Sequence, residues 1–174
     1  MSMIHFPRRR LSAVILYHGS NVEVKEPKVL ASNRALDFGA GFYTTSSEGQ
    51  AKRWATLQAR RRRTGKPIVS GYEFNLEEAS QVLSIHRFKE ADADWLEFVS
   101  ANRRGSYGGP PHDVVIGPVA NDNTMPVIND FMAGVIDEET ALILLKPQKL
   151  VDQYAFLTDS ALRHLTFLEA RLYG

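Results

Sequence analysis

The feature of the sequence that most constrains the fold is the irregular order of its strand-like and helix-like segments. Runs rich in β-branched and aromatic residues are short, and the helical segments between them do not follow the regular strand–helix–strand repeat of a parallel sheet. This mixture is typical of an α+β domain. The expected strands are 13–17, 68–75, 82–88, 113–119 and 150–157, and the expected helices are 47–62, 92–105, 124–135, 138–145 and one after Thr158. The pattern of 168–173 suits a helix or a last strand equally well.

The composition narrows the functional classes. We expect one domain at a length of 174 residues, with a loose basic arm at 1–12. With 21 lysines and arginines against 20 acidic residues, no overall field directs the protein to nucleic acid or membrane. The absence of cysteine excludes disulfides and thiolate chemistry. No metal-ligand spacing, secretory signal or membrane-length apolar stretch is recognisable, so we expect a cytoplasmic protein without a metal.

A glycine-rich turn at 37–45 is the strongest local signal. Gly39 and Gly41 leave the backbone free to turn tightly or to lie close to a ligand, and Phe42 and Tyr43 follow at once. Bare backbone beside large aromatic faces can form a slot for a flat ring. We expect the face of Tyr43, rather than its hydroxyl, to carry such binding. The alternative is a simple turn into an edge strand, with Tyr43 as a packing residue.

Three other residues are candidates for a site, and each also has an ordinary structural explanation. His18 ends the first strand, where a backbone carbonyl could hold it. Trp54 lies on the helix after the glycine turn and could be core. Gln153 is a lone amide on an otherwise apolar strand face, where it needs a partner or a ligand because an unpaired buried amide is costly.

Two of these segments carry a family resemblance. Tyr17-His18-Gly19-Ser20, followed by Gly39-Ala40-Gly41-Phe42-Tyr43 and the helix start at Ser46-Ser47, resembles the NAD-binding motifs of the ADP-ribosyltransferase superfamily. The similarity is to its His-Tyr-Glu branch, which includes the poly-ADP-ribose polymerases and diphtheria toxin. The whole chain also resembles a small bacterial family of uncharacterised, ADP-ribosyltransferase-like proteins that often sit beside a small antitoxin-like partner. The shared features are Tyr17–Ser20, the turn Asp37–Thr45, the segment Asp113–Asp122, and Asp152-Gln153 before Phe156. The resemblance implies a split mixed β-sheet core with surrounding helices.

The resemblance also implies residue roles. His18 is expected to bond the adenosine ribose of NAD, and the Gly19 backbone to hold the nicotinamide carboxamide. Tyr43 is expected to stack on the nicotinamide ring, with Trp54 as a second aromatic. The residues implied to bind NAD are His18, Gly19, Ser20, Gly41, Tyr43 and Trp54.

The chain departs from the superfamily at the third motif. A glutamate on a late strand usually bonds the nicotinamide ribose, whereas Gln153 stands here by order and strand context. Glu138 and Glu139 are rivals, although they look like the solvated first turn of a helix. An amide can accept the ribose hydroxyl but brings no charge to an oxocarbenium ion. We therefore expect Gln153→Glu to preserve activity or raise it, provided the strand face tolerates a carboxylate.

The function implied is a toxin-like, NAD-dependent mono-ADP-ribosyltransferase, a glycosyltransferase with Gln153 and Tyr43 as catalytic residues. An NAD glycohydrolase, or a degenerate module that binds NAD or ADP-ribose and acts through a partner, are the alternatives. The acceptor could be protein or nucleic acid, and a small antitoxin is an expected partner. Arg60–Arg63 could favour nucleic acid, but positive charge also suits the C-terminal end of a helix.

Overall fold

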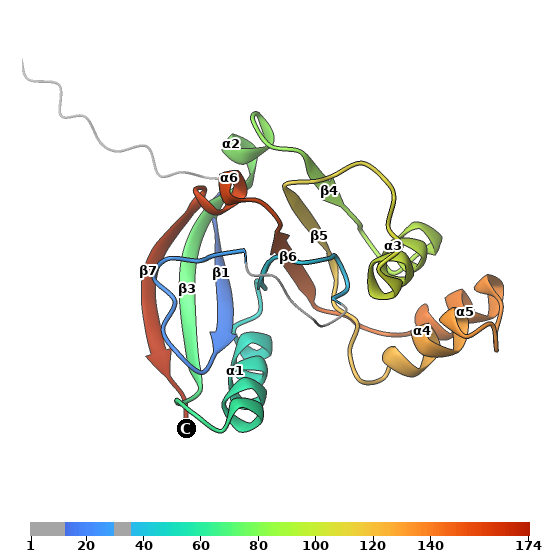
Figure 1. The fold of residues 1–174 in the computed structure, drawn as a ribbon, viewed down its shortest axis with the longest axis horizontal. Coiled ribbons are helices and arrows are strands. Elements are labelled where there is room, and N and C mark those ends of the chain that lie inside the picture. The colour runs from blue at the N-terminus through green and yellow to red at the C-terminus, as the bar shows by residue number, and fades with distance from the viewer. Residues whose placement is uncertain (1–12, 30–35) are drawn as a thin grey trace, which may run out of the picture.

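The computed structural model describes residues 13–29 and 36–174, and over these ranges the chain is an α+β structure with two small sheets (Figure 1). The basic arm expected at 1–12 lies outside the described residues. No helix within the described ranges has both the length and the apolarity needed to span a bilayer.

The first sheet is antiparallel and has three strands. It contains β1 (Ala13–Ser20), β3 (Ile68–Asn75) and β7 (Leu165–Leu172) in the order β1-β3-β7. The segment 168–173, for which the sequence suited a helix or a strand equally well, is part of β7 up to Leu172 and so forms a strand. Because β3 lies in the centre, β1 is an edge strand and carries His18 and Gly19 on that edge.

The second sheet is mixed and has four strands. It contains β2 (Phe42–Thr44), β6 (Asp152–Phe156), β5 (Val114–Pro118) and β4 (Ile85–Arg87) in the order β2-β6-β5-β4. Only β4 and β5 pair in parallel. The expected strands at 82–88, 113–119 and 150–157 are therefore confirmed in shortened form. The glycine turn leads into β2, the edge of this sheet that faces β1.

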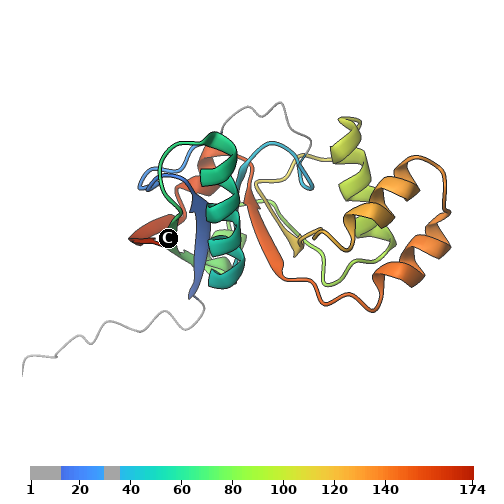
Figure 2. The same cartoon turned by 90° about the horizontal axis from the view of Figure 1, so that it is seen from below.

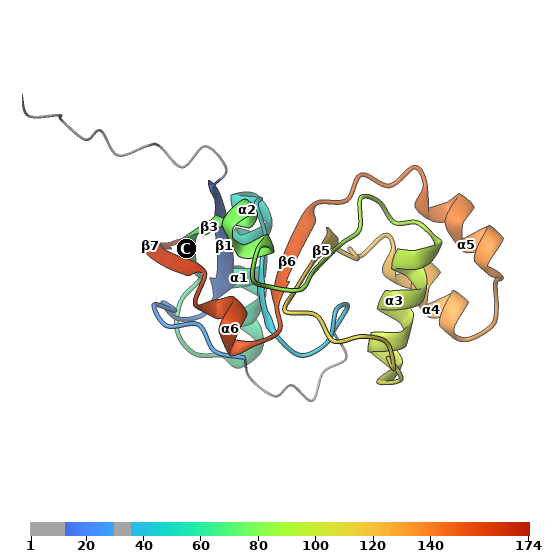
Figure 3. The ribbon, with the colours of Figure 1, turned by 90° about the horizontal axis from the view of Figure 1, so that it is seen from above.

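The two sheets share a core of large apolar side chains. Leu16, Tyr72 and Phe74 of the first sheet pack against Phe42 and Phe156 of the second. This contact leaves one face of each sheet to be covered by helices (Figures 1 and 3). Burial of these aromatic and aliphatic side chains supplies the main driving force for bringing the sheets together.

Helices cover the remaining faces. On the first sheet, α1 (Glu48–Arg62) covers one face (Figure 2). Its Ala51 and Ala55 are buried with Val69 of β3 and lie against Gly19 of β1. On the second sheet a separate cluster around Phe38 and Trp95 joins three helices. These are α3 (Ala93–Arg104), α4 (Met125–Met132) and α5 (Glu138–Leu145), while α2 (Leu76–Ser80) and α6 (Asp159–Leu162) are short.

Most helix starts follow the capping residues in the sequence. The Ser47 side chain accepts from the backbone N–H of Gln50, and Asp92 caps α3 in the same way. Thr124 is the N-cap residue of α4, as expected, but its hydroxyl bonds Asn121 and makes no capping bond. The expectation that this helix reaches Val135 is wrong, because α4 ends at Met132.

The run Arg60–Arg63 lies at the C-terminal end of α1, as the helix-end interpretation predicts. Arg62 donates to the Asn21 side chain at 3.0 Å. One arginine of the run is therefore tied to the chain that follows β1.

Gly19 sets how closely α1 approaches β1. A Cβ at this position would lie 1.9 Å from the Ala51 carbonyl oxygen and 2.7 Å from the Ala55 nitrogen. Both contacts are with helix backbone, which cannot move aside as a flexible side chain can. The glycine in the His-Gly pair therefore has a packing role in addition to any ligand role.

We predict that Gly19→Ala destabilises the fold by about 2 kcal/mol or more, because it forces α1 away from the sheet. Gly108→Ala is the matched control, since nothing lies within 4 Å of a Cβ there. Urea denaturation of both variants measures the difference. Equal stabilities would show that α1 does not pack on Gly19 as described.

Candidate functional site

The candidate site lies where the two sheets separate. Tyr17 and Thr45 join the sheets by two backbone hydrogen bonds, of 2.8 and 2.9 Å. Beyond this bridge, β1 continues to Gly19 and Ser20 while no further backbone pair of the described residues links it to β2. Because backbone directions alternate along a strand, the N–H and C=O of Gly19 point to the same side as those of Tyr17, away from β3. No described residue bonds either group.

His18 spans this separation. Its Nδ1 lies 2.7 Å from the Tyr43 carbonyl oxygen, and its ring stacks on Phe42 with centroids 4.2 Å apart. A carbonyl can only accept, so Nδ1 carries the proton and Nε2 keeps a lone pair. Burial lowers the pKa of His18 from 6.5 to about 4; nearby Arg62 also lowers it and the bond to Tyr43 opposes both. At neutral pH the imidazole is thus an uncharged acceptor at Nε2.

Tyr43 is held to the glycine turn by its hydroxyl. Tyr43 Oη donates to the Gly39 carbonyl at 2.5 Å and accepts from the Phe38 N–H at 3.0 Å. Burial raises the pKa of this hydroxyl, so it stays protonated. The expectation that only the ring face matters is therefore incomplete, since the hydroxyl fixes the ring and closes the turn.

Gly41 has a packing explanation. A Cβ at Gly41 would lie 2.6 Å from Leu157 Cδ2 and 2.7 Å from the Phe156 carbonyl oxygen. The turn therefore needs glycine at this position to approach the end of β6, and a contact of Gly41 with a ligand stays a prediction.

Gln153 is buried beside the same turn. It lies two residues before Ala155, the partner of Tyr43 in the β2–β6 register, so Gln153 and the Tyr43 side chain project from the same face. Its Nε2 donates to Asp37 Oδ2 at 3.2 Å and, more distantly, to the Pro118 carbonyl at 3.5 Å. The amide thus has the partner that a buried amide requires.

Asp37 is a site residue that the sequence did not single out. It is only 6% exposed, and Arg103 of α3 donates Nε–H to its Oδ1 at 2.7 Å. The Ala120 N–H donates to Oδ2 at 3.2 Å. Asp37 is the first residue of the glycine turn, so its position beside the turn could be read from the sequence. Nothing in the sequence links it to an arginine 66 residues away.

The structure therefore brings the predicted residues together in two groups. His18 contacts the Tyr43 backbone, and Gln153 contacts the turn that holds the Tyr43 side chain. The His18 ring lies on the inter-sheet side with Phe42, so it reaches the separation from the opposite face to Gln153. No described contact joins His18 directly to Gln153.

The remaining predicted residues lie around these groups. Ser20 is buried and donates to Asn21 Oδ1 at 3.3 Å, which turns its hydroxyl toward the end of the strand. Trp54 is half-buried on α1 and belongs to none of the three buried clusters, so the alternative that made it a core residue is wrong. Glu138 and Glu139 are exposed in the first turn of α5, as expected for solvated residues.

A second carboxylate lies beside Gln153 on the other face of β6. Asp152 accepts from the Ser46 N–H at 3.0 Å and from the Ser46 hydroxyl at 2.7 Å. These bonds tie the start of β6 to the residues that precede α1. Within the described ranges, no group of three or more His, Asp or Glu side chains is placed to hold a metal ion.

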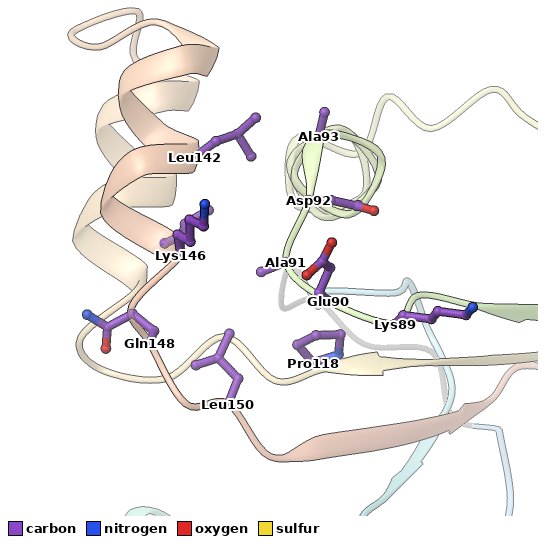
Figure 4. A pocket seen from close by; sticks show the side chains of 11 residues that line it. Lys89, Glu90, Ala91, Asp92, Ala93, Pro118, Leu142, Lys146, Gln148 and Leu150 are labelled. Atoms are coloured by element: carbon purple, nitrogen blue, oxygen red, sulfur yellow. The ribbon is translucent and has the colours of Figure 1, made fainter.

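Two grooves lie next to this region without containing His18, Tyr43 or Gln153. One has a volume of about 410 Å³ and lies between α5 and the segment that enters α3 (Figure 4). The other, of about 500 Å³, is lined by Arg87, Asp152 and Tyr154 among others. Pro118 lines both, and its carbonyl is the distant partner of Gln153.

Comparison with known families assigns the chain to one of them. A family model described as "Protein of unknown function (DUF3990)" matches residues 14–167. The chain belongs to this family. The match runs from β1 into β7, so it includes His18, Tyr43 and Gln153. No curated protein and no solved structure matched the chain. Membership of the DUF3990 family assigns no reaction, which leaves the site geometry to support one.

We predict that Tyr43→Phe lowers the free energy of unfolding by about 1–3 kcal/mol, because it leaves the Phe38 N–H and the Gly39 carbonyl without a partner. Tyr107→Phe is the control, since it removes an exposed hydroxyl that bonds the Pro110 carbonyl. Chemical denaturation measures both. A Tyr43→Phe variant as stable as the control would contradict the structural role of the hydroxyl.

We predict that stability falls as the pH is lowered from 6.5 to 4, because the folded pKa of His18 lies below its ordinary value. In this window the unfolded chain takes up a proton that the folded chain excludes. His18→Gln should flatten this part of the stability–pH curve, measured by urea denaturation at several pH values. His164→Gln is the control. An unchanged slope in His18→Gln would show that His18 does not titrate in this way.

Proposed function

We propose that the protein is an NAD-dependent mono-ADP-ribosyltransferase with an ADP-ribosyltransferase-like split-sheet fold. The observation that carries the proposal is that no described residue bonds the N–H and C=O of Gly19 on the edge of β1 beside Tyr43. One strand residue presents a donor and an acceptor side by side there. A primary carboxamide has one acceptor and two donors. It can therefore accept from the Gly19 N–H and donate to the Gly19 carbonyl, as the backbone of a neighbouring strand would. Nicotinamide carries such a carboxamide on a flat ring.

The surrounding residues suit the rest of the ligand. Trp54 is half-buried on the helix that packs on Gly19, and Tyr43 is fixed on the other strand, so the two could face a nicotinamide ring from either side. His18 Nε2 could accept from an adenosine ribose hydroxyl, since its Nδ1 proton is already committed to Tyr43. Gln153 Oε1 could accept from the nicotinamide ribose.

The reaction follows from this placement. The bond between the nicotinamide nitrogen and ribose C1′ breaks, and nicotinamide leaves as a neutral molecule with the electron pair of that bond. C1′ becomes an oxocarbenium ion, as in glycoside hydrolysis. A nucleophile on the acceptor then bonds C1′ and loses its proton to solvent. The work of the protein is to orient the dinucleotide and exclude water, and no general acid is needed for the leaving group.

Gln153 favours a single transfer over chain elongation. A neutral amide orients the ribose but adds no charge next to C1′, which limits stabilisation of the transition state. On the basis of family resemblance, the proposal includes a bacterial, cytoplasmic, toxin-like role with a small neutralising partner. The acceptor is a macromolecule, either protein or nucleic acid.

Incubation of the purified chain with NAD labelled in its adenine moiety and with a cell extract tests the proposal. We predict that label passes to a macromolecule and that nicotinamide is released in equal amount. Trp54→Ala should raise the KM for NAD about ten-fold or more through lost stacking. Leu57→Ala, at an exposed position of the same helix, is the matched control and should leave the KM unchanged.

Each of the other outcomes of this experiment supports one of the alternative functions or contradicts all of them. Free ADP-ribose with no labelled macromolecule indicates a glycohydrolase, in which water is the acceptor. Binding of NAD without cleavage indicates a degenerate binding module. NAD that is neither bound nor cleaved would contradict the proposal in all three forms.

A further inference from the structure

We propose that Asp37, held by Arg103, is a positioning residue that sets the orientation of the Gln153 amide for the reaction; the inference rests on the proposed function. The same short turn that holds the Tyr43 ring would then also hold the group that orients the ribose. The sequence gives no role to either Asp37 or Arg103, and the inference comes from their contacts.

The Asp37 carboxylate is a buried junction of four segments. Its Oδ1 accepts from Arg103 of α3, and its Oδ2 accepts from the Ala120 N–H after β5 and from Gln153 Nε2 on β6. Asp37 itself belongs to the glycine turn. Burial of a carboxylate is costly unless it is paired and hydrogen-bonded, and the Arg103 guanidinium provides the opposite charge.

These contacts determine which end of the Gln153 amide faces inward. Asp37 Oδ2 and the Pro118 carbonyl are both acceptors, so the NH₂ group must be the end that faces them. The carbonyl end, Oε1, is therefore directed away from Asp37. No described residue donates to Oε1, which leaves it able to accept a hydroxyl of the substrate.

The same contacts explain why the strand carries glutamine. A glutamate in place of Gln153 would put a second carboxylate within hydrogen-bond distance of Asp37, and two such groups cannot both ionise without strong repulsion. The expectation that Gln153→Glu alone preserves or raises activity is therefore replaced by the opposite one. The negative charge of the site is instead on Asp37. In the proposal, Gln153 lies between Asp37 and the ligand, and Arg103 neutralises the Asp37 charge.

Exchanging the two functional groups tests the inference. In Asp37→Asn, an amide that keeps its oxygen toward Arg103 turns its NH₂ group toward two donors, the Ala120 N–H and the Gln153 NH₂ group. The acceptor that orients the Gln153 amide is then lost, and Oε1 is no longer held toward the ribose. We predict that kcat for NAD cleavage falls about ten- to a hundred-fold, with the KM for NAD changed less than about threefold.

Gln153→Glu should also lose activity at neutral pH, and it should regain part of it as the pH falls and the two carboxylates come to share one proton. The double variant Asp37→Asn/Gln153→Glu restores a donor–acceptor pair with the wild-type net charge. Its kcat should exceed that of either single variant, because the introduced amide can donate to one oxygen of the introduced carboxylate while the other oxygen faces the ribose. A purely structural role would lower Tm without this recovery.

Asp113→Asn is the matched control, because Asp113 also links distant segments through its carboxylate, accepting from the Ser84 N–H and the Thr158 hydroxyl. It should lower Tm but leave kcat per folded molecule unchanged. Wild-type kcat in Asp37→Asn, or a double variant no more active than the singles, overturns the inference while the proposed function stands. A wild-type chain that does not cleave NAD overturns both.

Discussion

The ion pair between Asp37 and Arg103 is the interaction on which the candidate site depends. It fixes the glycine turn to α3, and through the same carboxylate to the end of β5 and to Gln153 on β6. The turn in turn holds the Tyr43 hydroxyl. A buried pair with one partner removed is strongly destabilising, so these four segments are coupled rather than independent. The position of the Tyr43 ring and of the Gln153 amide is thus a consequence of one charged contact.

A second constraint is the way the two sheets meet. Their shared core joins side chains of β1 and β3 to Phe42 and Phe156, while the described backbones touch at a single bridge, Tyr17–Thr45. Because the strands separate beyond the bridge, Gly19 keeps a donor and an acceptor that no described residue bonds. An unpaired edge is normally a liability for a sheet. Here α1 covers the face of Gly19, so this residue is buried although its outward N–H and C=O have no described partner.

The sequence predicted much of the fold because local signals and tertiary packing agree. Capping residues placed the starts of α1 and α3, and the helix at 138–145 and the strand at 68–75 have the expected bounds. Thr124 is at the N-cap position of α4 as predicted, but its hydroxyl closes a local turn with Asn121, which competes with side-chain capping. Of the site, the motif residues His18, Tyr43 and Gln153 could be named in advance. Asp37 and Arg103 could not be paired, since an arginine near a helix end looks the same whether it faces solvent or a buried carboxylate.

The central claim is that the Gly19 edge binds the carboxamide of NAD, and hydrogen exchange at single backbone amides tests it most directly. In the free protein the Gly19 amide, which has no described partner, should exchange faster than the Tyr17 amide, which is bonded to Thr45. Saturating NAD should slow exchange at Gly19 by about tenfold or more and leave Tyr17 unchanged. Unaltered exchange at Gly19, with NAD-induced protection around the groove of Lys89, Ala91 and Leu150 instead, would contradict the account.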